Sequence, residues 1–152
     1  MAYIDQAELK QQFPDKDLSE LANDPTGQAS DIEIREIIAA RILDAQSFVD
    51  SYLNQKYQVP FADTAVPDSV RHATGVVAYY RLHERRTEMI TEQVQQLYDQ
   101  TVEWLRDIAK GIISLPQPPA VGGGKSSTYF GAETREFQGI SHDNTTDMMA
   151  GF

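Results

Sequence analysis

Residues 31 to 54 carry the feature that most constrains the fold of this chain. Apolar side chains recur there every three or four residues, which is the spacing of one face of an α-helix. Ser30 and Glu33 stand at the two positions of a capping box, so the start of that helix is also marked. Because a face this long has to be covered by other elements, the pattern predicts a helix from about Asp31 to Asn54 inside a helical bundle. The predicted face consists of Ile34, Ile37, Ile38, Arg41, Ile42, Ala45, Phe48, Val49, Tyr52 and Leu53, with Arg41 as its sole polar member.

Two more long helices are predicted after this one. The first opens at about residue 67, and Gly75 in its middle indicates close approach by another helix. The second follows a capping Thr87 and ends at Lys110, where Gly111 supplies a frequent helix stop. Their apolar side chains are Val70, Ala73, Val76, Val77 and Tyr80 in the first helix, and Ile90, Val94, Leu97, Tyr98, Val102, Trp104, Leu105, Ile108 and Ala109 in the second.

The rest of the first 115 residues predicts short elements. Asp5 and Glu8 form another capping box, and the helix behind it ends near Pro14. Apolar residues at positions 18, 21 and 22 indicate a further helical turn, and residues 57–67 are expected to pack across the helices as an extended segment. No run before residue 116 alternates as a strand does. We therefore predict an all-α fold, a small bundle of three main helices plus one or two short ones.

Composition changes after Leu115. Residues 116–124 hold three prolines and three glycines, which do not propagate a helix. We predict a helical domain at 1–115 and a Pro/Gly linker with an extended C-terminal tail at 116–152. Large apolar side chains on such a tail are typical of a segment that docks on a neighbouring subunit or a partner, and folding back on its own domain is the alternative. The candidate anchors are Tyr129, Phe130, Phe137, Met148, Met149 and Phe152.

The charge of the chain excludes several functions. Its formal net charge is −10, and residues 1–68 hold 13 acids against 5 bases. An excess of acid argues against broad binding to nucleic acid and against anionic membrane surfaces, because both need clustered Lys and Arg. The chain has no cysteine, which removes disulfide scaffolds, thiolate zinc sites and cysteine nucleophiles.

Nothing in the sequence predicts catalysis, a cofactor or a metal site. The glycine run before Lys125 lacks the earlier glycine of a phosphate-binding loop, since position 119 is Pro119, and it is better interpreted as a flexible linker. His72 and His83 lie on one predicted helix about 16 Å apart, too far to share a metal ion. We therefore expect the protein not to be an enzyme.

One short basic and aromatic cluster stands out between positions 79 and 86. It consists of Arg81, Arg85 and Arg86 together with Tyr79 and Tyr80. Three cations are a small footprint for DNA, so pairing with acids of a neighbouring subunit or of the first half of the chain is favoured over contact with phosphate.

Several segments, in this order, resemble the head–tail connector (neck or adaptor) family of Mu-like bacteriophages and prophages. The residues that carry the resemblance are Met1–Ile4 with Gln6, Leu9 and Phe13, then Asp24–Gly27, Tyr52–Leu53, Tyr57–Phe61, Val66–Pro67, Tyr80–Leu82, Trp104–Leu115 and the closing Asp147–Phe152. The resemblance covers nearly the whole chain, apart from the glycine-rich middle of the tail.

The resemblance implies a structural protein of the virion. Such connectors are small helical proteins, made in the host cytoplasm, that assemble as a ring, commonly of twelve subunits. The ring lies beneath the portal protein, in the neck between capsid and tail, where it also meets a tail completion protein and lets packaged DNA pass through its lumen. The family implies no catalytic residue, cofactor or membrane contact. The alternative from a different class is a small cytosolic helical regulatory protein that binds protein or DNA through Tyr79–Arg86.

Overall fold

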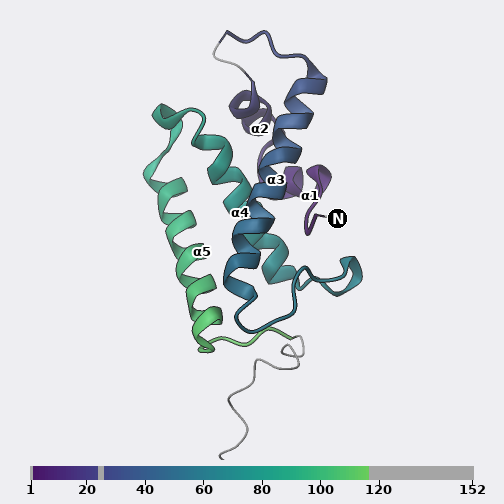
Figure 1. Ribbon diagram of the computed structural model, residues 1–152. Coiled ribbons are helices and arrows are strands. Elements are labelled where there is room, and N and C mark those ends of the chain that lie inside the picture. Colours follow the sequence, from purple (N-terminus) through teal and green to yellow (C-terminus); the bar gives the residue numbers. More distant parts are fainter. Residues whose placement is uncertain (1, 24–25, 117–152) are drawn as a thin grey trace, which may run out of the picture. The chain divides into compact units, whose positions relative to one another are not determined.

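The computed structural model describes residues 2–23 and 26–116 of the chain. Within these ranges every regular element is helical, so the predicted all-α fold is confirmed (Figure 1). Three helices are long and two are short, as predicted. None of the described helices combines the length and the apolar character that crossing a bilayer requires. The helices are α1 (Gln6–Gln12), α2 (Asp15–Ala22), α3 (Asp31–Leu53), α4 (Asp68–His83) and α5 (Glu92–Lys110), with short 3₁₀ helices at Asp63–Ala65 and Thr87–Met89.

The capping boxes set the starts of α1 and α3 as predicted. At α3, the backbone N–H of Ser30 donates to the Glu33 carboxylate at 2.7 Å, and the N–H of Glu33 donates back to the Ser30 hydroxyl at 3.3 Å. The hydrogen bonds from the backbone and hydroxyl of Ser30 hold the pKa of Glu33 below its ordinary value. The start predicted for α5 was wrong: Thr87 opens a 3₁₀ helix, and Thr91 caps α5 by accepting from the N–H of Val94 at 3.3 Å.

The core lies where α3, α4 and α5 pack together, and the N-terminal segment, α1 and α2 add buried side chains to it. The predicted apolar face of α3 is confirmed along its centre line, where Ile38, Ile42, Ala45, Val49 and Leu53 are buried, and Phe48 and Tyr52 beside it are half-buried. Arg41, the polar member of that face, lies at the edge and forms a 3.0 Å ion pair with Asp44. The largest fully buried side chains are Ile4, Leu9, Leu18, Leu21, Leu53, Leu82, Leu105, Ile108, Val49, Val70, Val76 and Val77.

Gly75 marks a close approach, as predicted, and the approaching group is a side chain of α1. A Cβ at Gly75 would lie 2.9 Å from Cδ of Gln12 and 3.2 Å from its Nε2. The absence of a side chain on Gly75 therefore lets α1 lie close to α4.

Residues 57–67 pack across the helices as predicted, with one 3₁₀ turn among them. Tyr57 and Val66 are buried, and the Tyr57 hydroxyl accepts a 2.7 Å hydrogen bond from the backbone N–H of Leu115. The Tyr3 hydroxyl accepts from the N–H of Phe61 at 3.0 Å and donates to the carboxylate of Asp50. These bonds tie the residues after α5, the middle segment and the N-terminal segment to the same bundle.

Candidate interaction surfaces

Arg85 and Arg86 of the basic cluster point to the end of α2. Arg85 Nη1 donates to the carbonyl oxygen of Ala22 at 2.5 Å, and Arg86 Nη2 donates to that of Asn23 at 3.1 Å. The last carbonyls of a helix have no partner within the helix and carry the negative end of its dipole, so two guanidinium groups stabilise them. Both arginines therefore serve the packing of α2 against α4.

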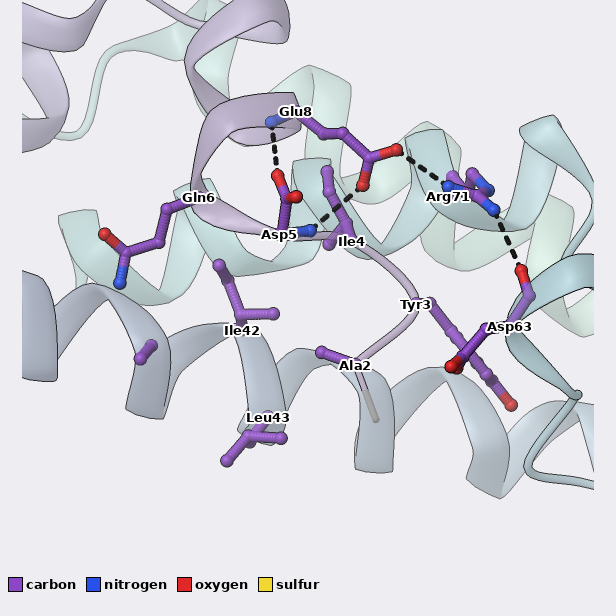
Figure 2. A pocket seen from close by; sticks show the side chains of 11 residues that line it. Ala2, Tyr3, Ile4, Asp5, Gln6, Glu8, Ile42, Leu43, Asp63 and Arg71 are labelled. Atoms are coloured by element: carbon purple, nitrogen blue, oxygen red, sulfur yellow. Dashed lines mark hydrogen bonds and ion pairs between the residues drawn. The ribbon is translucent and has the colours of Figure 1, made fainter.

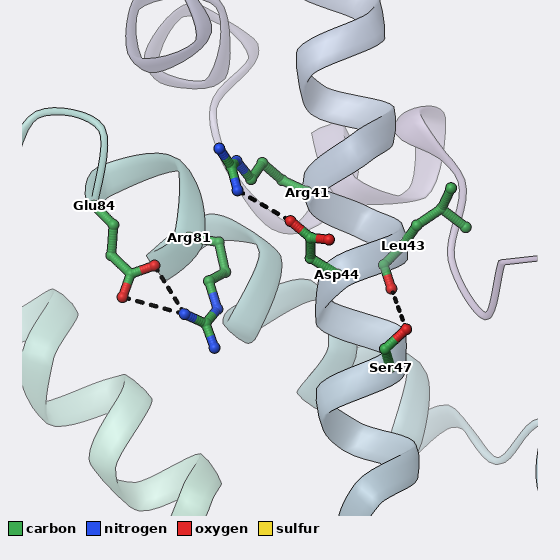
Figure 3. A network of polar contacts seen from close by, with 6 residues as sticks. All are labelled: Arg41, Leu43, Asp44, Ser47, Arg81 and Glu84. Carbon is green, nitrogen blue, oxygen red and sulfur yellow. Dashed lines mark hydrogen bonds and ion pairs between the residues drawn. The ribbon is translucent and has the colours of Figure 1, made fainter.

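Arg81 lies on another side of α4. It forms an ion pair with Glu84 at 3.0 Å, and its guanidinium carbon is 5.4 Å from the centre of the Phe48 ring. Figure 3 shows this pair at the end of α4 and the Arg41–Asp44 pair on α3. Both pairs are partly exposed, so each contributes little to stability.

The two tyrosines of the cluster are also in different environments. The ring of Tyr79 stacks on Phe13 with centroids 4.0 Å apart, whereas that of Tyr80 stacks on Tyr98 at 3.9 Å. Because neighbouring residues of a helix point about 100° apart, the side chains of Tyr79 and Tyr80 lie on different sides of α4. The structure therefore does not gather the five residues of the cluster into one phosphate site. The six predicted anchors of the tail, Tyr129, Phe130, Phe137, Met148, Met149 and Phe152, lie outside the described residues.

A groove that sequence reasoning missed lies beside the N-terminal segment, and we call it the N-terminal groove (Figure 2). It has a volume of about 530 Å³ and an apolar floor. Leu43 lines it and is 56% exposed. Arg71 holds one end, where it pairs with Glu8 at 2.7 Å and donates to the carbonyl oxygen of Asp63 at 3.1 Å. Its lining residues are Ala2, Tyr3, Ile4, Asp5, Gln6, Glu8, Ala39, Ile42, Leu43, Asp63 and Arg71.

A second, neutral groove of about 300 Å³ lies between α4 and α5. Trp104 lines it and is half-buried, so this side chain is neither a full core residue nor a free surface residue. His72 is exposed at this groove, whereas His83, on the same helix, is buried and bonds to the Tyr79 carbonyl at 3.0 Å. Among the residues that the structure describes, no three His, Asp or Glu side chains are grouped to hold a metal ion.

Comparison with known proteins identifies this chain as a phage protein. The sequence pattern of the family described as "Bacteriophage Mu, Gp36" matches residues 3–127, which is most of the chain. The chain therefore belongs to the bacteriophage Mu gp36 family.

Two relatives support this assignment. The chain is 33% identical over 85 residues to "Gene product J" of Escherichia phage Mu, covering 56% of this chain and 54% of that protein. It is 30% identical over 114 residues to "Mu-like prophage FluMu protein gp36" of Haemophilus influenzae, covering 74% of each chain. The matched region thus spans about half the length of the phage Mu protein.

Proposed function

We propose that this protein is a head–tail connector, a structural protein of the virion neck that forms a ring beneath the portal. The observation that carries the proposal is membership of a Mu phage family over residues 3–127, together with the helical body. A ring forms when two unlike surfaces of one subunit meet in successive copies. The grooves and exposed apolar side chains on different parts of the body supply such surfaces.

In this proposal the protein works by assembly and not by catalysis, and it uses no cofactor. Its partners are other copies of the chain, the portal protein on one side and a tail completion protein on the other. Packaged DNA passes through the lumen without sequence-specific binding. The acid excess of residues 1–68 supports free passage, because carboxylates repel the phosphate backbone.

The alternative of a cytosolic regulator that binds DNA or protein through Tyr79–Arg86 has less support. Arg85 and Arg86 contact the end of α2, and Arg81 pairs with Glu84. A DNA site built from these residues would have to break contacts that hold the bundle.

Mixing the purified full-length protein with its portal, followed by negative-stain imaging, tests the proposal. Closed rings attached to the portal are the expected result. A chain that stays monomeric with the portal, and that is missing from virions, would rule the connector function out.

A further inference from the structure

The end of α5 presents an apolar side chain to solvent. Gly111 adopts a left-handed conformation with φ 80°, and the N–H of Ile112 donates back to the carbonyl oxygen of Asp107 at 2.9 Å. In this type of helix end the side chain after the glycine commonly packs on the residue whose carbonyl it bonds. Because that residue is Asp107 here, Ile112 has no apolar partner at that position, and it is 70% exposed.

Two lysines lie near Ile112, Lys110 close in sequence and Lys56 close in space. Lys110 precedes the helix-ending glycine, and Lys56 lies against that glycine, with Cε and Nζ 3.3 Å from the position that a Cβ on Gly111 would take. Within the described ranges neither lysine forms an ion pair. Asp107 offsets one of the two charges, so the surface around Ile112 is apolar with a net positive rim.

The N-terminal groove has the complementary character. Its floor is apolar, and its lining holds three carboxylates, those of Asp5, Glu8 and Asp63, against the single guanidinium of Arg71. Figure 2 shows Leu43 on the α3 side of the groove and Arg71 near Asp63 and Glu8. An apolar side chain flanked by cationic side chains would fit this groove, because the apolar group would pack on the floor and the cations would face the carboxylates.

The other exposed large apolar side chains do not suit this groove. Ile32 is 68% exposed, but it lies between Asp31 and Glu33, which the carboxylates of the groove would repel. Leu43 lines the groove itself. Among the large exposed apolar side chains of the described residues, Ile112 is therefore the one with matching charge.

We propose that Ile112 of one copy inserts into the N-terminal groove of the next copy, with Lys56 and Lys110 facing the carboxylates of the groove. The N-terminal segment and α5 lie on opposite sides of α3 in Figure 1, so the two surfaces stay available on the same subunit. A contact between unlike surfaces leaves one of each free, and repeating it yields a ring or a filament. This inference rests on the proposed function and names one pair of surfaces through which the ring forms.

Two single substitutions and a control test the contact in the full-length protein by sedimentation velocity. Ile112→Asp and Leu43→Asp are each expected to weaken self-assembly about tenfold or more, because each places a carboxylate against an apolar surface. Ile32→Asp changes a side chain of similar exposure outside the contact and should assemble as the wild type does. Circular dichroism checks that all three variants remain helical.

Mixing the variants sharpens the test. Ile112→Asp keeps an intact groove and Leu43→Asp keeps an intact Ile112, so a one-to-one mixture should form a heterodimer and stop there.

Reversing the charges tests the electrostatic part of the contact. Asp63→Lys and Lys110→Glu should each weaken assembly, and combining them in one chain should restore much of it. Neither substitution removes a side-chain bond found in the described structure. If Ile112→Asp assembles like the wild type while the wild type forms rings, the inference is wrong and the connector function stands. A wild type that never assembles, alone or with portal, contradicts both.

Discussion

The guanidinium of Arg85, in the turn that follows α4, donates a 2.5 Å hydrogen bond to the carbonyl oxygen of Ala22, the last residue of α2, across 63 residues of sequence. This bond shows that the most basic stretch of the chain makes a contact within the subunit, between the end of α4 and the end of α2. Arg86 repeats it one residue further on, at the carbonyl of Asn23. A cluster that suggests a ligand site in the sequence therefore joins two helices in the structure.

Arg85→Ala should lower the free energy of unfolding by about 1–3 kcal/mol. The substitution removes a charged donor from carbonyl groups at a partly buried helix end. Urea denaturation measures the change. Arg81→Ala is the matched control, since its pair with Glu84 is partly exposed and should contribute about 1 kcal/mol or less. An equal loss in the two variants would contradict the structural role of Arg85.

Combining Arg85→Ala with Arg86→Ala should leave DNA affinity unchanged. Fluorescence anisotropy of a labelled 20-base-pair duplex at low salt measures it, with circular dichroism run in parallel. Wild-type binding is expected to be weak because the chain is acidic. Tight, salt-sensitive binding that the double substitution abolishes would instead favour the regulatory alternative.

Tyr57→Phe should also destabilise the subunit by about 1–3 kcal/mol. The Tyr57 hydroxyl is the acceptor for the backbone N–H of Leu115, and the substitution leaves that buried N–H without it. Thermal unfolding checks the prediction. Tyr52→Phe removes a hydroxyl from a half-buried tyrosine of α3 and should have little effect. If both variants had the melting temperature of the wild type, the hydrogen bond between Tyr57 and Leu115 would not contribute to the stability of the subunit.

The pH dependence of the free energy of unfolding should reveal the raised pKa of Asp50. Burial raises the pKa of its carboxyl group, and the hydrogen bond from Tyr3 opposes the rise. The folded state thus keeps this proton to a higher pH than the unfolded chain does. The stability that Asp50 contributes is full below its ordinary pKa of 3.8, and it is lost as the pH rises through the raised value.

Urea denaturation between pH 3.5 and 7 of the wild type and of Asp50→Asn measures that effect. The wild type should lose stability relative to the variant as the pH rises. Tyr3→Phe removes the opposing hydrogen bond, so the loss should extend to higher pH in that variant. A wild type that gains stability relative to Asp50→Asn over this range would contradict the burial of the carboxyl group.

Deleting residues 116–152 should leave the helical domain folded and stop assembly. The bond between Tyr57 and Leu115 is retained in the shortened chain, so its melting temperature should stay close to that of the full-length protein. Sedimentation velocity should then show monomers, because the proposed ring needs the predicted apolar anchors of the tail in addition to the contact between Ile112 and the N-terminal groove. A large drop in melting temperature would favour a tail that folds back on its own domain.

The helices were predictable because their signals are local. Capping boxes at Asp5 and Ser30, the apolar period of residues 31–54 and the glycine at position 111 each act within a few residues. The start of α5 was missed because Thr87 and Thr91 both carry a hydroxyl able to cap, and local sequence does not rank them.

The candidate surfaces were largely hidden because they depend on residues far apart in the chain. The role of Arg85 requires the end of α2, 63 residues earlier. The N-terminal groove combines the N-terminal segment and α1 with α3, the 3₁₀ helix at Asp63–Ala65 and α4, and no periodicity connects them. The exposed Ile112 could have been noticed as an apolar residue just after a helix-ending glycine.

Cryo-electron microscopy of purified virions tests most directly whether this chain forms the neck ring. The connector function predicts a closed ring of helical subunits between portal and tail, with residues 2–116 fitting the density and the end of each α5 next to the N-terminal groove of its neighbour. Virions that lack the chain, or that carry it only in the capsid shell or the tail tube, would contradict it.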